Sequence, residues 1–214
     1  MLLSILPCGP IQANCYFLCD EATNNCIVID PGDAEPVLKY ASEQHYTIKK
    51  VVLTHGHFDH CMGVSGIIDS VQPEVWINRL DSEFIDGSLD YFSAMQCELT
   101  PFSPTNYIED KSVITMDSIQ LEAIHTPGHS KGSMSFVDRN HKFVFSGDTL
   151  FFESIGRTDL HGGSMRDLAH SLFETLYSLP DSFTVFPGHG PKTTISHEKA
   201  NNPLNRFKDH AWLD

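Results

Sequence analysis

The chain has 214 residues, of which 28 are acidic and 14 basic, so its formal net charge is −14. This acidity argues against a nucleic-acid partner, because phosphate binding needs basic patches. Hydrophobic residues make up 41% of the sequence and no linker interrupts it, so we expect one domain over residues 1–214. No run approaches the roughly 18 apolar residues of a membrane span. With no secretory segment to export its six cysteines, the protein is expected to be cytoplasmic.

Apolar runs, alternating or continuous, predict the strands in chain order. In the first half they lie near residues 2–6, 13–19, 26–29, 50–54 and 75–77. Helices are expected over 34–44 and 63–71, whereas residues 79–110 show no clear pattern. The second half predicts strands near residues 112–116, 119–125, 133–138, 142–146 and 183–186. Ser164 begins a further helix, whose apolar residues recur at helical spacing until Pro180 ends it.

The loop after the strand at 50–54 holds the densest set of potential metal ligands. His55, His57, Asp59 and His60 fall within six residues. His55 and His57 share a parity, so they project to the same side of an extended chain. Imidazole mixed with carboxylate suits zinc, iron or manganese rather than calcium. This loop therefore predicts a metal site.

Three later strands also end in glycine-containing loops, each with one more potential ligand. These ligands are His129, Asp148 and His189, in the segments TPGH, SGD and PGHG. Seven ligands are too many for one tetrahedral ion, so the four loops predict two metal ions with positions left for water. Two such ions make a shared water acidic and polarise a carbonyl, which is hydrolytic chemistry. No GxSxG segment offers a serine nucleophile instead.

The order of these motifs, HxHxDH followed by TPGH, SGD and PGHG, resembles the metallo-β-lactamase superfamily over nearly the whole chain. Residues 29–32 (IDPG) resemble the early turn of that family. Residues 155–159 (IGRTD) and 202–203 are similar to its short glyoxalase II-like (hydroxyacylglutathione hydrolase-like) branch. The resemblance implies an αββα sandwich of the α/β (α+β) class, in which two mixed sheets pack face to face with helices outside.

The resemblance also implies how the ligands divide. One ion would be held by His55, His57 and His129, the second by Asp59, His60 and His189, with the carboxylate of Asp148 bridging both. Asp59 and Asp148 are therefore the candidate catalytic residues. Zinc is the expected metal, with iron or manganese as alternatives. Glyoxalase II enzymes also carry a helical C-terminal domain that binds glutathione, and we expect no such domain here, because only 25 residues of the sequence follow His189.

We therefore expect a binuclear metal-dependent hydrolase that uses a metal-bridging hydroxide on a small thioester, such as a 2-hydroxyacyl (lactoyl) glutathione-type substrate. The alternatives are a persulfide dioxygenase with a single iron, a lactonase or phosphodiesterase of the same superfamily, and a non-catalytic metal-binding module. The GRTD-like segment is shared with the dioxygenases, whereas a complete second set of ligands favours two metals. Arg157 either grips a substrate carboxylate or forms a structural ion pair with Asp159.

Overall fold

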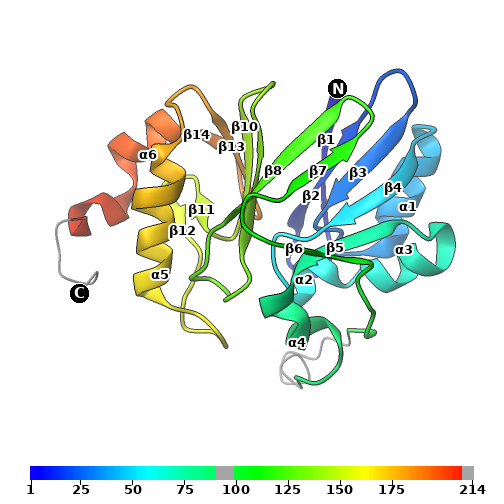
Figure 1. The fold of residues 1–214 in the computed structure, drawn as a ribbon, viewed down its shortest axis with the longest axis horizontal. Coiled ribbons are helices and arrows are strands. Elements are labelled where there is room, and N and C mark those ends of the chain that lie inside the picture. Colours follow the sequence, from blue (N-terminus) through cyan, green and yellow to red (C-terminus); the bar gives the residue numbers. More distant parts are fainter. Residues whose placement is uncertain (90–98, 209–214) are drawn as a thin grey trace.

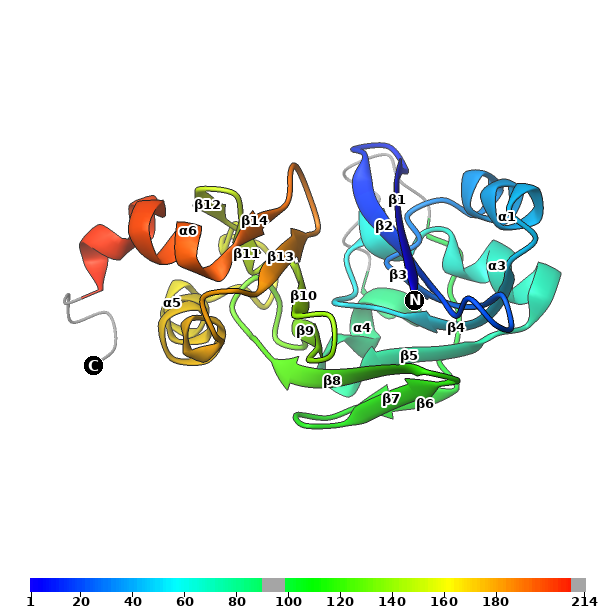
Figure 2. The ribbon, with the colours of Figure 1, turned by 90° about the horizontal axis from the view of Figure 1, so that it is seen from above.

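The computed structural model describes residues 1–89 and 99–208, which form an αββα sandwich (Figure 1). Two six-stranded sheets face each other at its centre. The helices α1 (Ala34–Glu43) and α3 (Val64–Val71) lie outside the first sheet, and α5 (Met165–His170) and α6 (Ile195–Asn201) outside the second. Figure 2, seen from above, shows the same order of layers. The predicted sandwich with two mixed sheets is confirmed.

The first sheet is built by the first half of the chain, with its strands in chain order. Neighbours from β1 to β3 are antiparallel and those from β3 to β6 are parallel. The strands are β1 (Leu2–Cys8), β2 (Ala13–Cys19), β3 (Asn25–Ile29), β4 (Thr47–Val52), β5 (Glu74–Asn78) and β6 (Asn106–Ile108). Two short helices, α2 (Phe58–Cys61) and α4 (Ser82–Ile85), follow β4 and β5.

The second sheet is built by the second half of the chain, in the order β14-β13-β10-β9-β8-β7. Its strands are β7 (Val113–Met116), β8 (Ile119–His125), β9 (Met134–Asp138), β10 (Phe143–Gly147), β13 (Thr184–Pro187) and β14 (Thr193–Thr194). Only β10 and β13 are parallel neighbours. A hairpin of β11 (Leu150–Phe151) and β12 (Ser154–Ile155) follows β10. Helix α5 continues into a π-helical turn over Ser171–Thr175.

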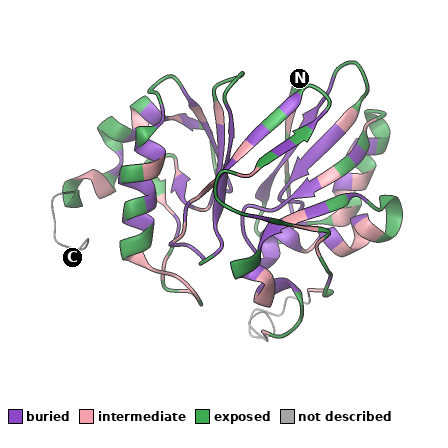
Figure 3. Cartoon of the chain, viewed as in Figure 1, coloured by how far each residue is buried: buried purple, intermediate pink, exposed green. Residues whose placement is uncertain are grey.

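Three apolar cores hold the four layers together, and β2 shows how the sequence fills two of them. Its residues are buried on both faces, which explains its continuous apolar run. Phe17 packs in the core beneath α1, whereas its neighbour Leu18 points between the sheets. A third core joins the second sheet to its helices through residues such as Leu172 and Ile195. Figure 3 shows the buried strands enclosed by helices with exposed outer faces.

The predicted elements differ from the observed ones mainly at their ends and where they are short. The strand expected at residues 50–54 runs from Thr47 to Val52. The elements β6, β11, β12, β14 and α4 were not predicted, because two to four residues are too few to show a periodic pattern. Residues 90–98, in the segment without a clear pattern, lie outside the described residues.

Cys19 and Cys26 face each other across β2 and β3 and form a disulfide, which no sequence signal predicted. Within residues 1–89 and 99–208, no helix combines the length and the apolar character that crossing a membrane requires.

Candidate metal centre and active-site cleft

The loops after β4, β8, β10 and β13 meet at one edge of the sandwich. The last three of these strands run in the same direction within the second sheet, so their carboxyl ends lie side by side. The loop after β4 joins them, because the Met134 N–H donates to the Thr54 carbonyl across the two sheets at 2.8 Å. The structure thus brings together all seven ligands predicted from the sequence, which are His55, His57, Asp59, His60, His129, Asp148 and His189.

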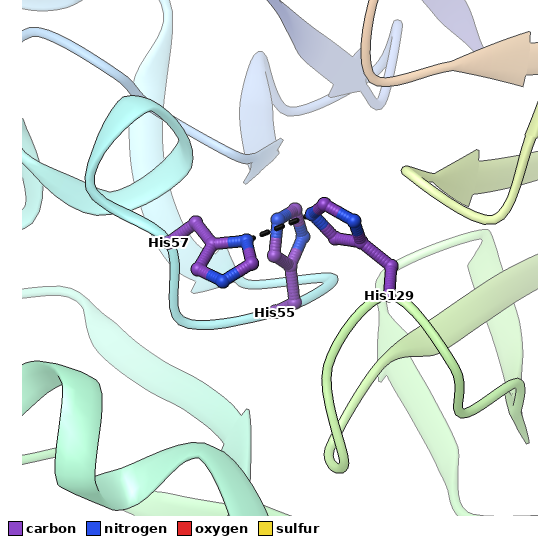
Figure 4. Close-up of side chains that lie close together, drawn as sticks. All are labelled: His55, His57 and His129. Carbon is purple, nitrogen blue, oxygen red and sulfur yellow. Dashed lines mark hydrogen bonds between the residues drawn. The ribbon is translucent and has the colours of Figure 1, made fainter. Parts of the chain in front are cut away.

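His55, His57 and His129 form the first group, and Figure 4 shows their rings converging from two loops. One ring nitrogen of each lies within 4.8 Å of those of the other two. His57 Nδ1 and His129 Nε2 are 2.8 Å apart. All three side chains are buried. Three imidazole nitrogens that face one point form a donor set for a divalent transition metal.

Asp59, His60 and His189 form the second group. The Asp59 Oδ2 atom lies 3.2 Å from His60 Nε2 and 3.0 Å from His189 Nε2. Asp148 lies between the two groups, with Oδ1 3.4 Å from His60 Nε2 and Oδ2 3.5 Å from His129 Nε2. Its carboxylate therefore has one oxygen facing each group, as a bridging ligand requires.

Several buried polar atoms of this centre lack the hydrogen bonds that buried polar atoms normally make. Among the described residues, His55 Nε2, His60 Nε2 and Asp148 Oδ1 are buried and make no hydrogen bond of good geometry, although the last two atoms face each other at 3.4 Å. Buried polar atoms are normally paired, because an unpaired one costs about 1–3 kcal/mol. Three such atoms within one cluster of histidines and carboxylates are accounted for if each binds a metal ion. The residues present therefore fit divalent metal ions.

In the rings of His55, His60 and His129, one nitrogen is held by a hydrogen bond that aims the other at the centre. His60 Nδ1–H donates to Asp30 Oδ2 at 3.0 Å, and His129 Nδ1–H donates to the Arg157 carbonyl at 2.8 Å. The Thr54 hydroxyl gives its single proton to Asp30 at 2.6 Å, so it accepts from His55 Nδ1–H at 3.0 Å. In His55 this leaves the Nε2 lone pair for a metal, and in His60 it directs Nε2 toward the carboxylates of Asp59 and Asp148. Such outer partners set ring tautomer and ligand basicity.

Asp30 holds both Thr54 and His60 by hydrogen bonds, a role that the IDPG turn in the sequence does not reveal. Its Oδ1 accepts from the Thr54 N–H at 2.7 Å, while Oδ2 serves the Thr54 hydroxyl and His60. Asp30 lies within reach of His55 and His60 as a third potential ligand group, but both its oxygens are thus engaged. Its backbone is left-handed, with φ at 54°, a conformation in which aspartate is enriched and which concentrates at functional sites. An aspartate directly before Pro31 was the available signal.

Burial and repulsion by neighbouring histidines keep His55 and His57 neutral. Burial, followed by the nearby histidines, lowers the pKa of His55 well below its usual range. The same two causes lower the pKa of His57 to about 3. Neutral imidazole is the form that binds metal, so these two rings are ready to act as ligands at neutral pH.

In the second group the pKa of the buried histidine shifts the other way, because carboxylates surround His60. Burial opposes charge on His60, but Asp59 and Asp148 outweigh it and raise its pKa well above the usual range. Burial likewise opposes ionisation of Asp59, yet His60 and His189 hold its pKa far below the ordinary value. The pKa of Asp148 is also lowered, by histidines of both groups that outweigh its burial. Both carboxylates are therefore ionised at neutral pH.

A cleft of about 410 Å³ opens over this centre. His57, Asp59, His129, Asp148 and His189 face it, and its remaining walls are mostly apolar. Those walls come from Ile11, Phe58, Phe151, Ile155 and Leu160. The volume suits a small molecule, since ligand pockets usually measure about 300–1,000 Å³.

Arg157 also lines the cleft, but its guanidinium already has a carboxylate partner. Its Nε and Nη2 donate to the two oxygens of Asp159 at 2.7 and 2.8 Å. Both side chains are largely exposed, so this ion pair exchanges easily with solvent. The geometry thus shows the ion pair that we considered for Arg157, at a position where a substrate carboxylate can compete with Asp159.

A family model and several known proteins are similar to this chain over most of its length. A family model described as the metallo-beta-lactamase superfamily matches residues 8–189. The hydroxyacylglutathione hydrolase GloC of Haemophilus influenzae is 31% identical over 97% of this chain and 100% of its own. The BLEG-1 B3 metallo-beta-lactamase has a TM-score of 0.89 at 34% identity, covering 95% of this chain and 99% of its own. TTHA1623, solved in a di-iron-bound form, has a TM-score of 0.85 at 33% identity, covering 94% and 99%.

These matches span both sheets and all four ligand loops. With its αββα fold and its clustered histidines and aspartates, the chain belongs to the metallo-β-lactamase superfamily of metal-dependent hydrolases.

Proposed function

We propose that this protein hydrolyses a small thioester of the 2-hydroxyacylglutathione type with two divalent metal ions. One observation carries the proposal: two three-ligand groups share the Asp148 carboxylate at the base of a small cleft with apolar walls. A mononuclear site has no use for the second group. The similarity to GloC supports the substrate class, because that relative is named for hydroxyacylglutathione hydrolysis and matches this chain over its full length.

The chain's own residues supply binding and orientation. His55, His57 and His129 would hold one ion, and Asp59, His60 and His189 the other, with Asp148 between them. Bound divalent ions polarise a substrate carbonyl and make a water acidic enough to attack at neutral pH. Zinc suits this donor set, and the di-iron form of TTHA1623 keeps iron as the main alternative.

The cleft walls would receive the organic part of the substrate. Phe58, Phe151 and Leu160 offer apolar contact, and Arg157 offers the guanidinium that can exchange Asp159 for a substrate carboxylate. A thioester needs no serine or cysteine nucleophile here, and Cys61 is unsuited to that role. Burial raises the pKa of its thiol well above the ordinary value, and the thiol donates a hydrogen bond toward the Gly56 and His57 carbonyls.

The test combines metal analysis with two assays on the same purified protein. We expect about two metal ions per chain and hydrolysis of S-lactoylglutathione. One iron per chain with oxygen uptake on glutathione persulfide would overturn the hydrolase in favour of a dioxygenase. Two metals with no thioester cleavage, but with activity on a lactone or phosphodiester, would keep the hydrolase class and overturn the substrate.

A further inference from the structure

Asp81 is a fully buried carboxylate outside both ligand groups. It ends the short 3₁₀ turn Arg79–Asp81 between β5 and α4, in the segment where the sequence shows no clear pattern. Its side chain accepts three hydrogen bonds. The Gly132 N–H donates to Oδ1 at 2.6 Å, while the Gly56 N–H at 2.9 Å and the Ser130 hydroxyl at 2.6 Å donate to Oδ2.

These three partners lie in the two loops that carry the first ligand group. Gly56 stands between His55 and His57, and Ser130 directly follows His129. One carboxylate therefore joins a loop of the first sheet to a loop of the second, at the residues next to all three ligands. The rings of His55 and His129 are themselves held separately, by the Thr54 hydroxyl and the Arg157 carbonyl.

The packing around Asp81 leaves no room for the loops to shift. A Cβ on Gly132 would lie 2.6 Å from Asp81 Oδ1, and a Cβ on Gly56 would lie 2.8 Å from the Cβ of Phe84. The Phe84 ring meets the His57 ring edge to face, with centroids 4.9 Å apart. The turn that ends at Asp81 and the helix α4 that carries Phe84 thus both pack against the ligand loops.

From this geometry we infer that Asp81 is a positioning residue for the first metal site, acting through the backbone of the two ligand loops. The inference rests on the proposed function only in taking His55, His57 and His129 as metal ligands. Asp81 sets the spacing between the His55–His57 pair and His129, and so the affinity of that site for metal.

This role needs two acceptor oxygens on Asp81, and not only its shape. All three partners are donors, and the Ser130 hydroxyl can give its proton to Asp81 while accepting from Ser133 at 2.8 Å. In Asp81→Asn, which has the same shape, the amide NH₂ must face at least one of these donors. The bond is then lost and a buried donor is left unpaired.

The experiment isolates the first site by working in a His189→Ala background, which disables the second group. Zinc affinity is measured in the full-length protein by competition with a chromophoric chelator. Adding Asp81→Asn should weaken zinc binding by roughly 10–100-fold, the range for lost outer partners of metal ligands. The matched control is Asp138→Asn, another buried carboxylate that caps a turn at the far end of β9 and should leave zinc affinity unchanged.

Ser130→Ala removes only one of the three bonds and protects the test against misfolding of Asp81→Asn. It should weaken zinc binding less than Asp81→Asn, and the double variant should fall short of the summed effects, because both act through one bond. Wild-type zinc affinity in Asp81→Asn or in Ser130→Ala would overturn the inference alone. Loss of zinc binding in His189→Ala by itself would overturn the first site, and with it both this inference and the proposed metal centre.

Discussion

The carboxylate of Asp148 serves both ligand groups, with one oxygen 3.4 Å from His60 and the other 3.5 Å from His129. We expect Asp148→Asn, which keeps the shape and removes the charge, to lower metal content at both sites. Turnover should fall by more than the roughly 100-fold that loss of an outer partner costs, because a direct ligand is changed. Elemental analysis and steady-state kinetics check this. Full activity with two metals bound would contradict the bridging role.

Gly188 shows how closely the backbone approaches the ligands. A Cβ at this position would lie 2.1 Å from Asp148 Oδ1 and 2.7 Å from His60 Cε1. Gly188→Ala should therefore displace both ligands, lower metal content and cost about 1–3 kcal/mol of unfolding free energy. The control is Gly190→Ala, where a Cβ meets nothing within 4 Å but φ is +75°. It should lose stability through backbone strain and keep its metal, as elemental analysis and denaturation would show.

The ligands were predictable from the sequence because each belongs to a short local pattern at the end of a strand. Asp30 and Asp81 were not predicted as site residues, because their roles depend on contacts across 24 to 51 residues of chain. Nothing local distinguishes the buried carboxylate of Asp81 from an exposed one. The roles of Asp30 and Asp81 can therefore be recognised only in the folded structure, where the loops lie side by side.

At the scale of elements, the hairpin β11–β12 forms one wall of the cleft and is held by α6. The buried carboxylate of Glu198 accepts from the Thr193 hydroxyl at 2.6 Å and from Asn202 Nδ2 at 2.9 Å. It also accepts from the Glu153 N–H, at the turn of the hairpin, at 3.0 Å. The hairpin carries Phe151 and Ile155, so α6 fixes the wall without itself lining the cleft.

Glu198→Gln should loosen this wall. The amide must face a donor where the carboxylate accepted one, so we expect a loss of about 1–3 kcal/mol of unfolding free energy. KM should rise while kcat stays near wild type, because the hairpin positions substrate and not the metals. Denaturant titration and kinetics check both parts. The exposed Glu174→Gln is the control and should change neither. An unchanged KM would separate the hairpin from substrate binding.

The strands that carry ligands were predictable, whereas the short elements around the cleft were not. β4, β8, β10 and β13 have enough apolar residues to show their pattern. The hairpin β11–β12 has two residues in each strand and depends on Glu198 for its position. Such elements line the cleft, so the sequence indicates the chemistry more readily than the substrate.

At the scale of the whole molecule, metal ions should add to the stability of the fold. The donor atoms converge only in the folded chain, so binding stabilises the folded state by about 4 kcal/mol per site at a thousandfold excess over Kd. We expect a chelator to lower the Tm and zinc to restore it, as measured by calorimetry. A Tm that does not respond to chelator or to zinc would show that the fold is complete without metal.

The two sheets are made by consecutive halves of the chain, and each group of candidate ligands draws residues from both halves. The ions would therefore cross-link the halves, and their affinity should report how well the two halves dock. Ile27 lies in the core between the sheets, whereas Ile48 lies in the core beneath α1. Shortening either to valine should cost about 0.5–1.5 kcal/mol. Only Ile27→Val should also weaken zinc binding in a chelator competition, and equal zinc affinities in the two variants would show that docking and metal binding are independent. If they are coupled, substitutions remote from every ligand can tune this centre through the fit of one half of the chain against the other.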